Sequence, residues 1–278
     1  MDGLTLLIIF CILLIGGAAA GTFAGFLGIG GAFLLIPFQL YILTELGYPP
    51  DISMKTAVAT TLCFTFPIAF NSAYTHSKKG TILWEKAVII GMSGFIFSFL
   101  GSYIATLLSA AYLCIIFGAI VLAASLKITS NKNENEDENK ISENSIIYII
   151  FGMIMGLASG LVGIGGGLIL VPLLILLLKF PMRKAVGLSS AAIAFTSAGG
   201  VCGYIINSIG VVSPIPYSFG YINPVFWIAL VIPGVIFSRF GATLSHKTDP
   251  KKIRLIFSIV AFLIGSFMIF KGATLWMA

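Results

Sequence analysis

Long apolar segments separated by short polar connections run through the whole chain. They predict ten helical elements, five in each half, over residues 4–27, 32–46, 56–75, 84–108, 110–127, 145–162, 167–179, 185–207, 222–243 and 253–275. A transmembrane helix needs about 20 apolar residues, so most of these elements can cross a bilayer. The second element of each half is too short to cross comfortably. The pattern therefore predicts an all-α integral membrane protein.

A glycine-rich phrase stands between the first and second elements of each half. Its two copies are Gly21-Thr-Phe-Ala-Gly25-Phe-Leu-Gly28-Ile-Gly30-Gly31 and Gly156-Leu-Ala-Ser-Gly160-Leu-Val-Gly163-Ile-Gly165-Gly166-Gly167. Consecutive glycines form poor helix, and broken backbone survives in hydrocarbon only where protein buries it or where it lines a cavity. We expect both phrases to break their helices near the bilayer midplane, as the tip of a re-entrant hairpin or as a kink in a full span.

The match between the halves continues beyond these glycines. Lys55-Thr-Ala57-Val58 loosely matches Lys184-Ala185-Val186, and a hydrophilic stretch separates the two halves. We expect a first transmembrane repeat over residues 1–127, a linker over 128–144 and a second repeat over 145–278. An odd number of elements in each half turns the second copy upside down, which is the inverted-topology plan of many secondary transporters.

Basic residues gather at alternate connections. By the positive-inside rule this side is cytoplasmic, which places the 128–144 linker inside and both termini outside a plasma membrane that the chain crosses several times. The opposite connections carry Asp2, Glu45 and Asp51, with little positive charge beyond Lys55 and Lys271. The clusters are Lys78, Lys79 and Lys86 after the third element, Lys127, Lys132 and Lys140 after the fifth, Lys179, Arg183 and Lys184 after the seventh, and Lys247, Lys251, Lys252 and Arg254 after the ninth.

The composition excludes a soluble globular domain, because 58% of the residues are hydrophobic and only 9% are charged. The net charge of +6 is scattered over connections instead of forming one face, so nucleic acid is not an expected partner. No Asp or Glu lies deep in an element, which argues against a carboxylate-lined cation pathway and against the usual intramembrane proton relay. The four cysteines have no metal-like spacing, and we expect no cofactor.

The glycine breaks are the candidate substrate site. A helix that restarts after a break presents free backbone N–H groups and the positive end of its dipole, which favour an anion. Hydroxyl and amide side chains in the third element of each half would add neutral donors, although a hydroxyl can also bond back to its own helix. The predicted substrate-binding residues are Gly28, Gly30, Gly31, Thr60, Thr61, Asn71, Gly163, Gly165, Gly166, Ser189 and Ser190.

Other readings of these residues stay open or are weaker. The four-residue spacing of Gly21 with Gly25, and of Gly156 with Gly160, suits close helix packing as well as a site. Lys55 could attract an anion to the mouth of a pathway or serve only as an orientation signal. Hydrolysis at Ser159 would need a facing histidine, and both histidines of the chain lie near connections, so we do not expect an enzyme.

Together these features resemble the TauE/SafE family, the sulfite exporters and their relatives. The resemblance rests on the paired glycine phrases that end in Pro37 and Pro172, the Ala57-Val58 and Ala185-Val186 segments, and the basic loop Lys78-Lys79-Gly80 before Trp84. It covers nearly the whole chain. It implies a secondary transporter, with export as the favoured direction, for a small sulfur-containing anion such as sulfite, an organosulfonate or thiosulfate.

The same resemblance implies alternating access around a midplane site between the two repeats, with the lipid bilayer and the anion as partners. Proton coupling and a homodimer are expectations of the same kind. The alternatives at this stage are a transporter of another small anion or of a metal cation, and a membrane scaffold without transport.

Overall fold

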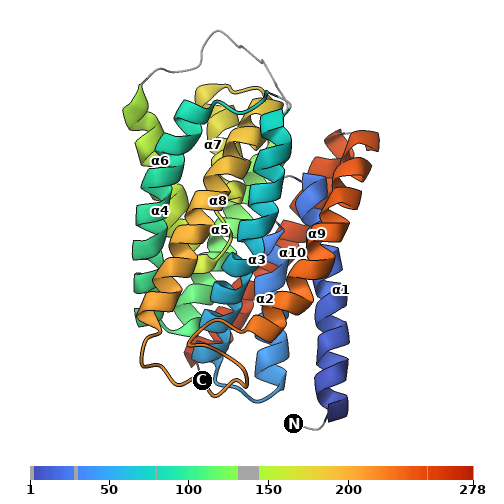
Figure 1. Ribbon diagram of the computed structural model, residues 1–278, viewed down its shortest axis with the longest axis vertical. Helices are drawn as coiled ribbons and strands as arrows, with labels where there is room; N and C mark the ends of the chain where they lie inside the picture. Colours follow the sequence, from blue (N-terminus) through green and yellow to red (C-terminus); the bar gives the residue numbers. More distant parts are fainter. Residues whose placement is uncertain (1–2, 28–30, 79, 131–143, 249, 278) are drawn as a thin grey trace.

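The computed structural model describes residues 3–27, 31–78, 80–130, 144–248 and 250–277 (Figure 1). Within these ranges the regular elements are helices, which confirms the all-α class, and seven of them are long and apolar enough to cross a membrane. The helices are α1 (Gly3–Leu27), α2 (Ala32–Glu45), α3 (Pro50–Lys78), α4 (Trp84–Leu107), α5 (Ala110–Ser130), α6 (Ser145–Val162), α7 (Gly167–Leu178), α8 (Met182–Asn207), α9 (Pro224–Lys247) and α10 (Pro250–Met277).

Several helices extend beyond the apolar segments that predicted them. α3 begins at Pro50 and α10 at Pro250, six and three residues before the predicted starts at 56 and 253. Proline fits the first turn of a helix, because its missing N–H would have had no partner there. The second element of each half is short as predicted, with 14 residues in α2 and 12 in α7.

Two closely packed helix pairs form opposite flanks of the bundle, α1 with α9 and α4 with α6 (Figure 1). Glycine permits the close approach in both pairs. A Cβ added to Gly21 of α1 would overlap the backbone of Gly234 in α9, and one added to Gly156 of α6 would overlap the backbone of Gly94 in α4. Equivalent positions of the two predicted halves therefore make equivalent contacts, and the packing role of Gly21 and Gly156 is confirmed.

The centre of the bundle is formed by α3 and α8, which pack against each other, while α5 packs along α10. Each of these pairings, like those of the flanks, joins a helix before the linker to a helix after it. The two halves thus interlock and share one hydrophobic interior instead of forming separate domains.

The two halves begin at opposite ends of the bundle. Figure 1 shows α1 beginning and α10 ending at the lower end, whereas α6 begins at the upper end. An upside-down second half requires this arrangement. The inverted-repeat relation and the side of the membrane that each end faces stay predictions.

Candidate functional site

The second glycine phrase is a break between two helices. α6 ends at Val162 and α7 begins at Gly167, and Gly163, Gly165 and Gly166 have φ values of +70°, +73° and +79°. Only glycine adopts this left-handed region without strain, so the glycines decide where the helix stops. The Gly163 N–H closes α6 by donating to the Ser159 carbonyl at 2.8 Å. The predicted break is confirmed for this copy.

The first phrase is described only in part. Gly31 precedes α2 with a φ of +60°, and a Cβ there would overlap the Ala20 carbonyl of α1. It therefore allows the start of α2 to lie directly against α1. Gly28 and Gly30 lie outside the described residues, and their role in a site stays a prediction.

The break between α6 and α7 lies at half height in the bundle, between the two central helices. A Cβ added to Gly165 would lie 2.9 Å from Thr65 Cγ2, 3.2 Å from Ile193 Cγ2 and 3.7 Å from Ser197 Oγ. Thr65 is at the middle of α3, and Ile193 is near the middle of α8. Thr196 of α8 also donates to the Gly165 carbonyl at 3.1 Å, which satisfies one of the groups that the break exposes.

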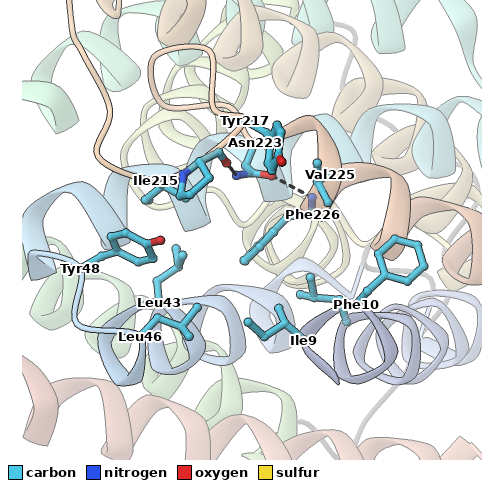
Figure 2. Close-up of a pocket in the computed structure, with 12 residues that line it drawn as sticks. Ile9, Phe10, Leu43, Leu46, Tyr48, Ile215, Tyr217, Asn223, Val225 and Phe226 are labelled. Atoms are coloured by element: carbon cyan, nitrogen blue, oxygen red, sulfur yellow. Dashed lines mark hydrogen bonds between the residues drawn. The ribbon is translucent and has the colours of Figure 1, made fainter. Parts of the chain in front are cut away.

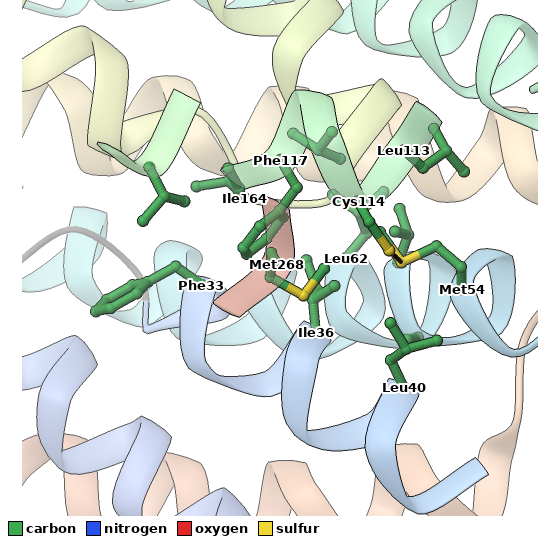
Figure 3. Packing of buried hydrophobic residues seen from close by; sticks show 14 of the residues in the cluster. Phe33, Ile36, Leu40, Met54, Leu62, Leu113, Cys114, Phe117, Ile164 and Met268 are labelled. Carbon is green, nitrogen blue, oxygen red and sulfur yellow. Dashed lines mark hydrogen bonds between the residues drawn. The ribbon is translucent and has the colours of Figure 1, made fainter. Parts of the chain in front are cut away.

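A single apolar side chain anchors the break. Ile164 stands between the glycines, is buried, and lies among core side chains from α2, α3, α5 and α10 (Figure 3). Ile36 of α2, which belongs to the same core, packs against Gly163: its Cδ1 would lie 3.0 Å from a Cβ added there. The glycine backbone is thus held on a packed support, while the Gly165 carbonyl accepts a bond from α8.

The helices that follow the two glycine phrases begin without a side-chain cap. Gly31 precedes α2 and Gly166 precedes α7, and glycine has no side chain with which to cap the helix. Both starts are buried. The first N–H groups of a helix have no partner inside the helix, and together with the helix dipole they form a positively polarised end. Just before α7, Gly165 lies beside Thr65 and Ser197, and Gly166 lies against Met155 of α6.

Several buried polar atoms around the central helices have no hydrogen-bond partner among the described residues. Leaving such an atom unpaired costs about 1–3 kcal/mol, so each of these atoms marks a position where a polar partner would be stabilising. Of these, Ser197 Oγ would lie 3.7 Å from a Cβ on Gly165 in the glycine break. The set comprises Gln39 Oε1, Thr56 Oγ1, Ser98 Oγ, Ser159 Oγ, Ser189 Oγ, Ser197 Oγ and Asn207 Nδ2.

The predicted hydroxyls are spread along the central helices instead of gathering at the break. Thr61 accepts a bond from Gln39 Nε2 at 2.7 Å, and Thr60 accepts one from the Asn223 N–H at 3.2 Å. Ser190 donates to the Val186 carbonyl at 2.9 Å. These hydroxyls have structural partners in this arrangement of the helices.

Two further predicted residues lie away from the break. Ser189 is buried and unpartnered, eight residues before Ser197 on α8, a separation of about 12 Å along the helix. Asn71 is half-buried and lies six residues past Thr65 on α3, about 9 Å along the axis. Their part in substrate binding, like that of the other predicted residues, stays a prediction.

The predicted substrate-binding set omits three residues that the structure places at or near the centre, although Thr65 and Ser197 are among the polar side chains that the sequence offers in the third element of each half. Thr65 and Ser197 flank Gly165, and Gln39 joins α2 to α3 through Thr61. The signal for Gln39 was present in the sequence, because it is an amide within the apolar run Phe33-Leu-Leu-Ile-Pro-Phe-Gln-Leu-Tyr. A buried amide in a membrane helix needs a partner and therefore marks a structural or functional contact.

A small apolar cleft opens elsewhere, between the beginning of α1, the end of α2 and the connection before α9 (Figure 2). Its lining includes Ile9, Leu43, Tyr48 and Phe226, and no charged side chain belongs to it. The cleft lies at the far end of the α1–α2 hairpin from Gly31. Its apolar lining does not suit a small anion, so we separate it from the candidate site.

Comparison with known proteins gives a match over most of the chain. The family model described as sulfite exporter TauE/SafE matches residues 13–268. A probable membrane transporter protein of Methanocaldococcus jannaschii is 31% identical over 266 residues, covering 95% of this chain and 96% of the relative. The probable membrane transporter protein YunE of Bacillus subtilis is 26% identical over 281 residues, covering 95% and 98%. No solved structure matches the chain.

Proposed function

Because the chain is a membrane transporter that belongs to the TauE/SafE sulfite exporter family, we propose that it carries a small sulfur-containing anion such as sulfite, an organosulfonate or thiosulfate. Transport is secondary and runs by alternating access, with export as the direction that the family description favours. The plasma membrane holds the protein with both termini outside.

The observation that carries this proposal is the buried, uncapped beginning of α7. Gly165, two residues before α7 begins, lies at half height in the bundle, and a Cβ on it would be 3.7 Å from the unpartnered Ser197 hydroxyl. Helix starts of this kind bind anions in soluble proteins and point at anionic substrate groups in transporters with broken helices. A sulfur oxyanion presents several oxygens to such donors.

The donors at the break are neutral, and this suits a carrier. Backbone N–H groups and the Ser197 hydroxyl can each donate one hydrogen bond to an anion oxygen, and a bond to a charged group contributes about 1.5–3 kcal/mol. Several such bonds offset the loss of water from a small anion. They do so without a fixed positive charge, which would hold the anion too firmly for release.

Alternating access requires a central site that opens to one end of the bundle at a time. The break lies between α3 and α8, which come from different halves, and it is covered on all sides in the described arrangement. We assign this arrangement to an occluded state. Opening to either side would then separate one of the flanking pairs, α1 with α9 or α4 with α6, from the central helices.

A substrate panel tests the proposal. Purified protein is heated with sulfite, thiosulfate, sulfoacetate, taurine, sulfate or chloride at matched ionic strength, and the unfolding temperature is recorded. A bound anion at a hundred times its Kd stabilises by about 2.7 kcal/mol, which the assay resolves. Flux of each hit is then measured in proteoliposomes.

We expect at least one sulfur oxyanion to raise the unfolding temperature and to show saturable flux. Chloride, the control, should do neither. Stabilisation by a divalent metal ion together with metal flux would favour the metal-cation alternative. No saturable flux for any member of the panel would refute the proposed substrate class.

A further inference from the structure

The connection between α8 and α9 folds back onto the first half of α3. Asn223 holds it there, because its backbone N–H donates to the Thr60 hydroxyl at 3.2 Å. The side chain of Asn223 binds its own connection, donating to the Pro216 carbonyl at 3.0 Å and to Ser218 Oγ at 2.9 Å, and it accepts from the Phe226 N–H at 2.9 Å. One residue thus fixes the fold of the connection, starts α9 and attaches both to α3.

A second attachment lies one turn further along α3. Pro67 cannot donate to the carbonyl four residues earlier, so the Cys63 carbonyl loses its partner inside the helix. Trp227 at the beginning of α9 donates to this carbonyl through Nε1 at 2.9 Å. The connection and the first turn of α9 therefore cover α3 from Thr60 to Cys63.

Lys55 stands at the edge of this cover. Its Nζ donates to the Thr106 carbonyl at 2.7 Å and lies 5.9 Å from the centre of the Tyr221 ring, which belongs to the connection. Asp51, the carboxylate one turn earlier on α3, bonds instead to the Ala110 N–H at the start of α5. The ammonium group thus contacts a carbonyl and an aromatic face, and it also interacts electrostatically with the Asp51 carboxylate.

A chain of contacts runs inward from Lys55 to the glycine break. The Tyr221 ring meets the Tyr204 ring edge to face, with centroids 6.1 Å apart. Tyr204 is fully buried on α8, and its hydroxyl donates to the Gly160 carbonyl at 3.2 Å. That carbonyl is in the last turn of α6, where it has no partner within the helix. These contacts connect Lys55 to the last turn of α6, next to the candidate site.

We infer that Lys55 is the docking cation for the anion at this mouth, and that the 208–223 connection, through Tyr221, closes the mouth above Thr56 and Thr60. The inference rests on the proposed function and names a substrate-binding residue within it. Thr56 lies one turn before Thr60 on the same face of α3, and its buried hydroxyl has no partner in the described part of the chain.

In this proposal the mouth opens when the anion takes the place of the present partners of the Lys55 ammonium group. An arriving anion competes with the Thr106 carbonyl for the ammonium group, because its full negative charge adds Coulomb attraction to the hydrogen bond. Movement of the ammonium group away from Tyr221 removes one contact of the connection. Opening also breaks the bond from the Asn223 N–H to Thr60, after which the hydroxyls of Thr56 and Thr60 become donors along the path. The charge distribution of the chain assigns this mouth to the extracytoplasmic side.

Sided transport kinetics test the docking role. Exchange of ³⁵S-labelled sulfite and thiosulfate is measured in right-side-out membrane vesicles, with the external or the internal concentration varied in turn. We expect Lys55→Gln to raise the external KM about tenfold or more, while the internal KM stays unchanged. Lys55→Arg keeps the charge and restores most of the affinity. Lys271→Gln is the matched control, because it removes one positive charge from α10 at the same end of the bundle.

The outcomes separate the two proposals. Wild-type vesicles without saturable exchange of either anion would refute the proposed function. Wild-type exchange with equal external KM values in the Lys55→Gln and Lys271→Gln variants would overturn the docking role alone. A change confined to the internal KM would overturn the assignment of this mouth to the outside.

Cysteine accessibility tests the closing role. In a protein freed of its native cysteines, Thr56→Cys should react slowly with an externally added thiol reagent. Adding Tyr221→Ala should raise the rate about tenfold or more, whereas Tyr221→Phe, which keeps the ring, should not. Equal rates in these two double variants would overturn the proposal that Tyr221 closes the mouth.

Discussion

Replacement of Gly165 by alanine is the sharpest test of the glycine break. Gly165 has a φ of +73°, and a Cβ there would lie 2.9 Å from Thr65 Cγ2 and 3.2 Å from Ile193 Cγ2. The new methyl group would therefore enter the space between α3 and α8, beside the Ser197 hydroxyl. It would strain the backbone and also occupy the volume in which an anion would meet the α7 N–H groups.

Two terms give the size of the effect. Holding alanine in the left-handed region costs about 1–2 kcal/mol. Forcing a methyl group into a packed interior adds about 1–3 kcal/mol. A site that has lost its volume should bind the anion about tenfold more weakly or worse, because the donors can no longer all reach it.

Gly80→Ala is the matched control. Gly80 has a φ of +65°, but a Cβ there meets nothing within 4 Å. It should lower the unfolding temperature through the backbone term alone and leave anion flux per folded protein unchanged. Gly165→Ala should lower the unfolding temperature further and abolish both anion-dependent stabilisation and flux in proteoliposomes. If Gly165→Ala transports as well as Gly80→Ala, the glycine break is not the substrate site.

Three further predictions follow from single contacts. Ser197→Ala removes an unpartnered buried hydroxyl, so it should increase the free energy of unfolding of the ligand-free protein by about 1 kcal/mol and raise its unfolding temperature. It should also reduce the stabilisation by sulfite, and an unchanged sulfite effect would contradict a binding role. Tyr204→Phe removes the bond to the α6 carbonyl and should destabilise the protein by about 1–2 kcal/mol in thermal unfolding, whereas no loss would show that the bond is dispensable. In a cysteine-free background, a cysteine at the exposed position Val212 should react with an impermeant thiol reagent added outside, and one at the exposed position Glu85 should react only with reagent inside. The reverse pattern would invert the assigned orientation.

The helices and the break were predictable because both follow from local chemistry. Apolar length gives the long helices, and the shortness of α2 and α7 follows from where the apolar runs end. Gly163, Gly165 and Gly166 stop α6 because consecutive glycines tolerate the positive φ values found there. The helix ends were less predictable, since backbone hydrogen bonds continue into polar residues such as Lys78 beyond the apolar run.

The partners of the helices could not be read from the sequence. Gly21 signals a close approach, but nothing in its surroundings says that the partner is Gly234 of α9, because the helices are apolar on most faces. The same holds for the polar contacts. Thr60 looked like a substrate ligand, yet its hydroxyl holds Asn223, 163 residues further along the chain. Serines at several depths of α8 look alike in sequence, and only the packing places Ser197 beside the break.

The interlocking of α1 with α9, of α4 with α6 and of α5 with α10 has a consequence for biosynthesis. During synthesis α1, α4 and α5 reach the bilayer before α9, α6 and α10, against which their glycine-containing faces pack in the finished protein. Those faces stay in lipid until the later helices are inserted, so neither half can mature alone. A gene cut at the linker should yield two polypeptides that accumulate only when both are made in the same cell.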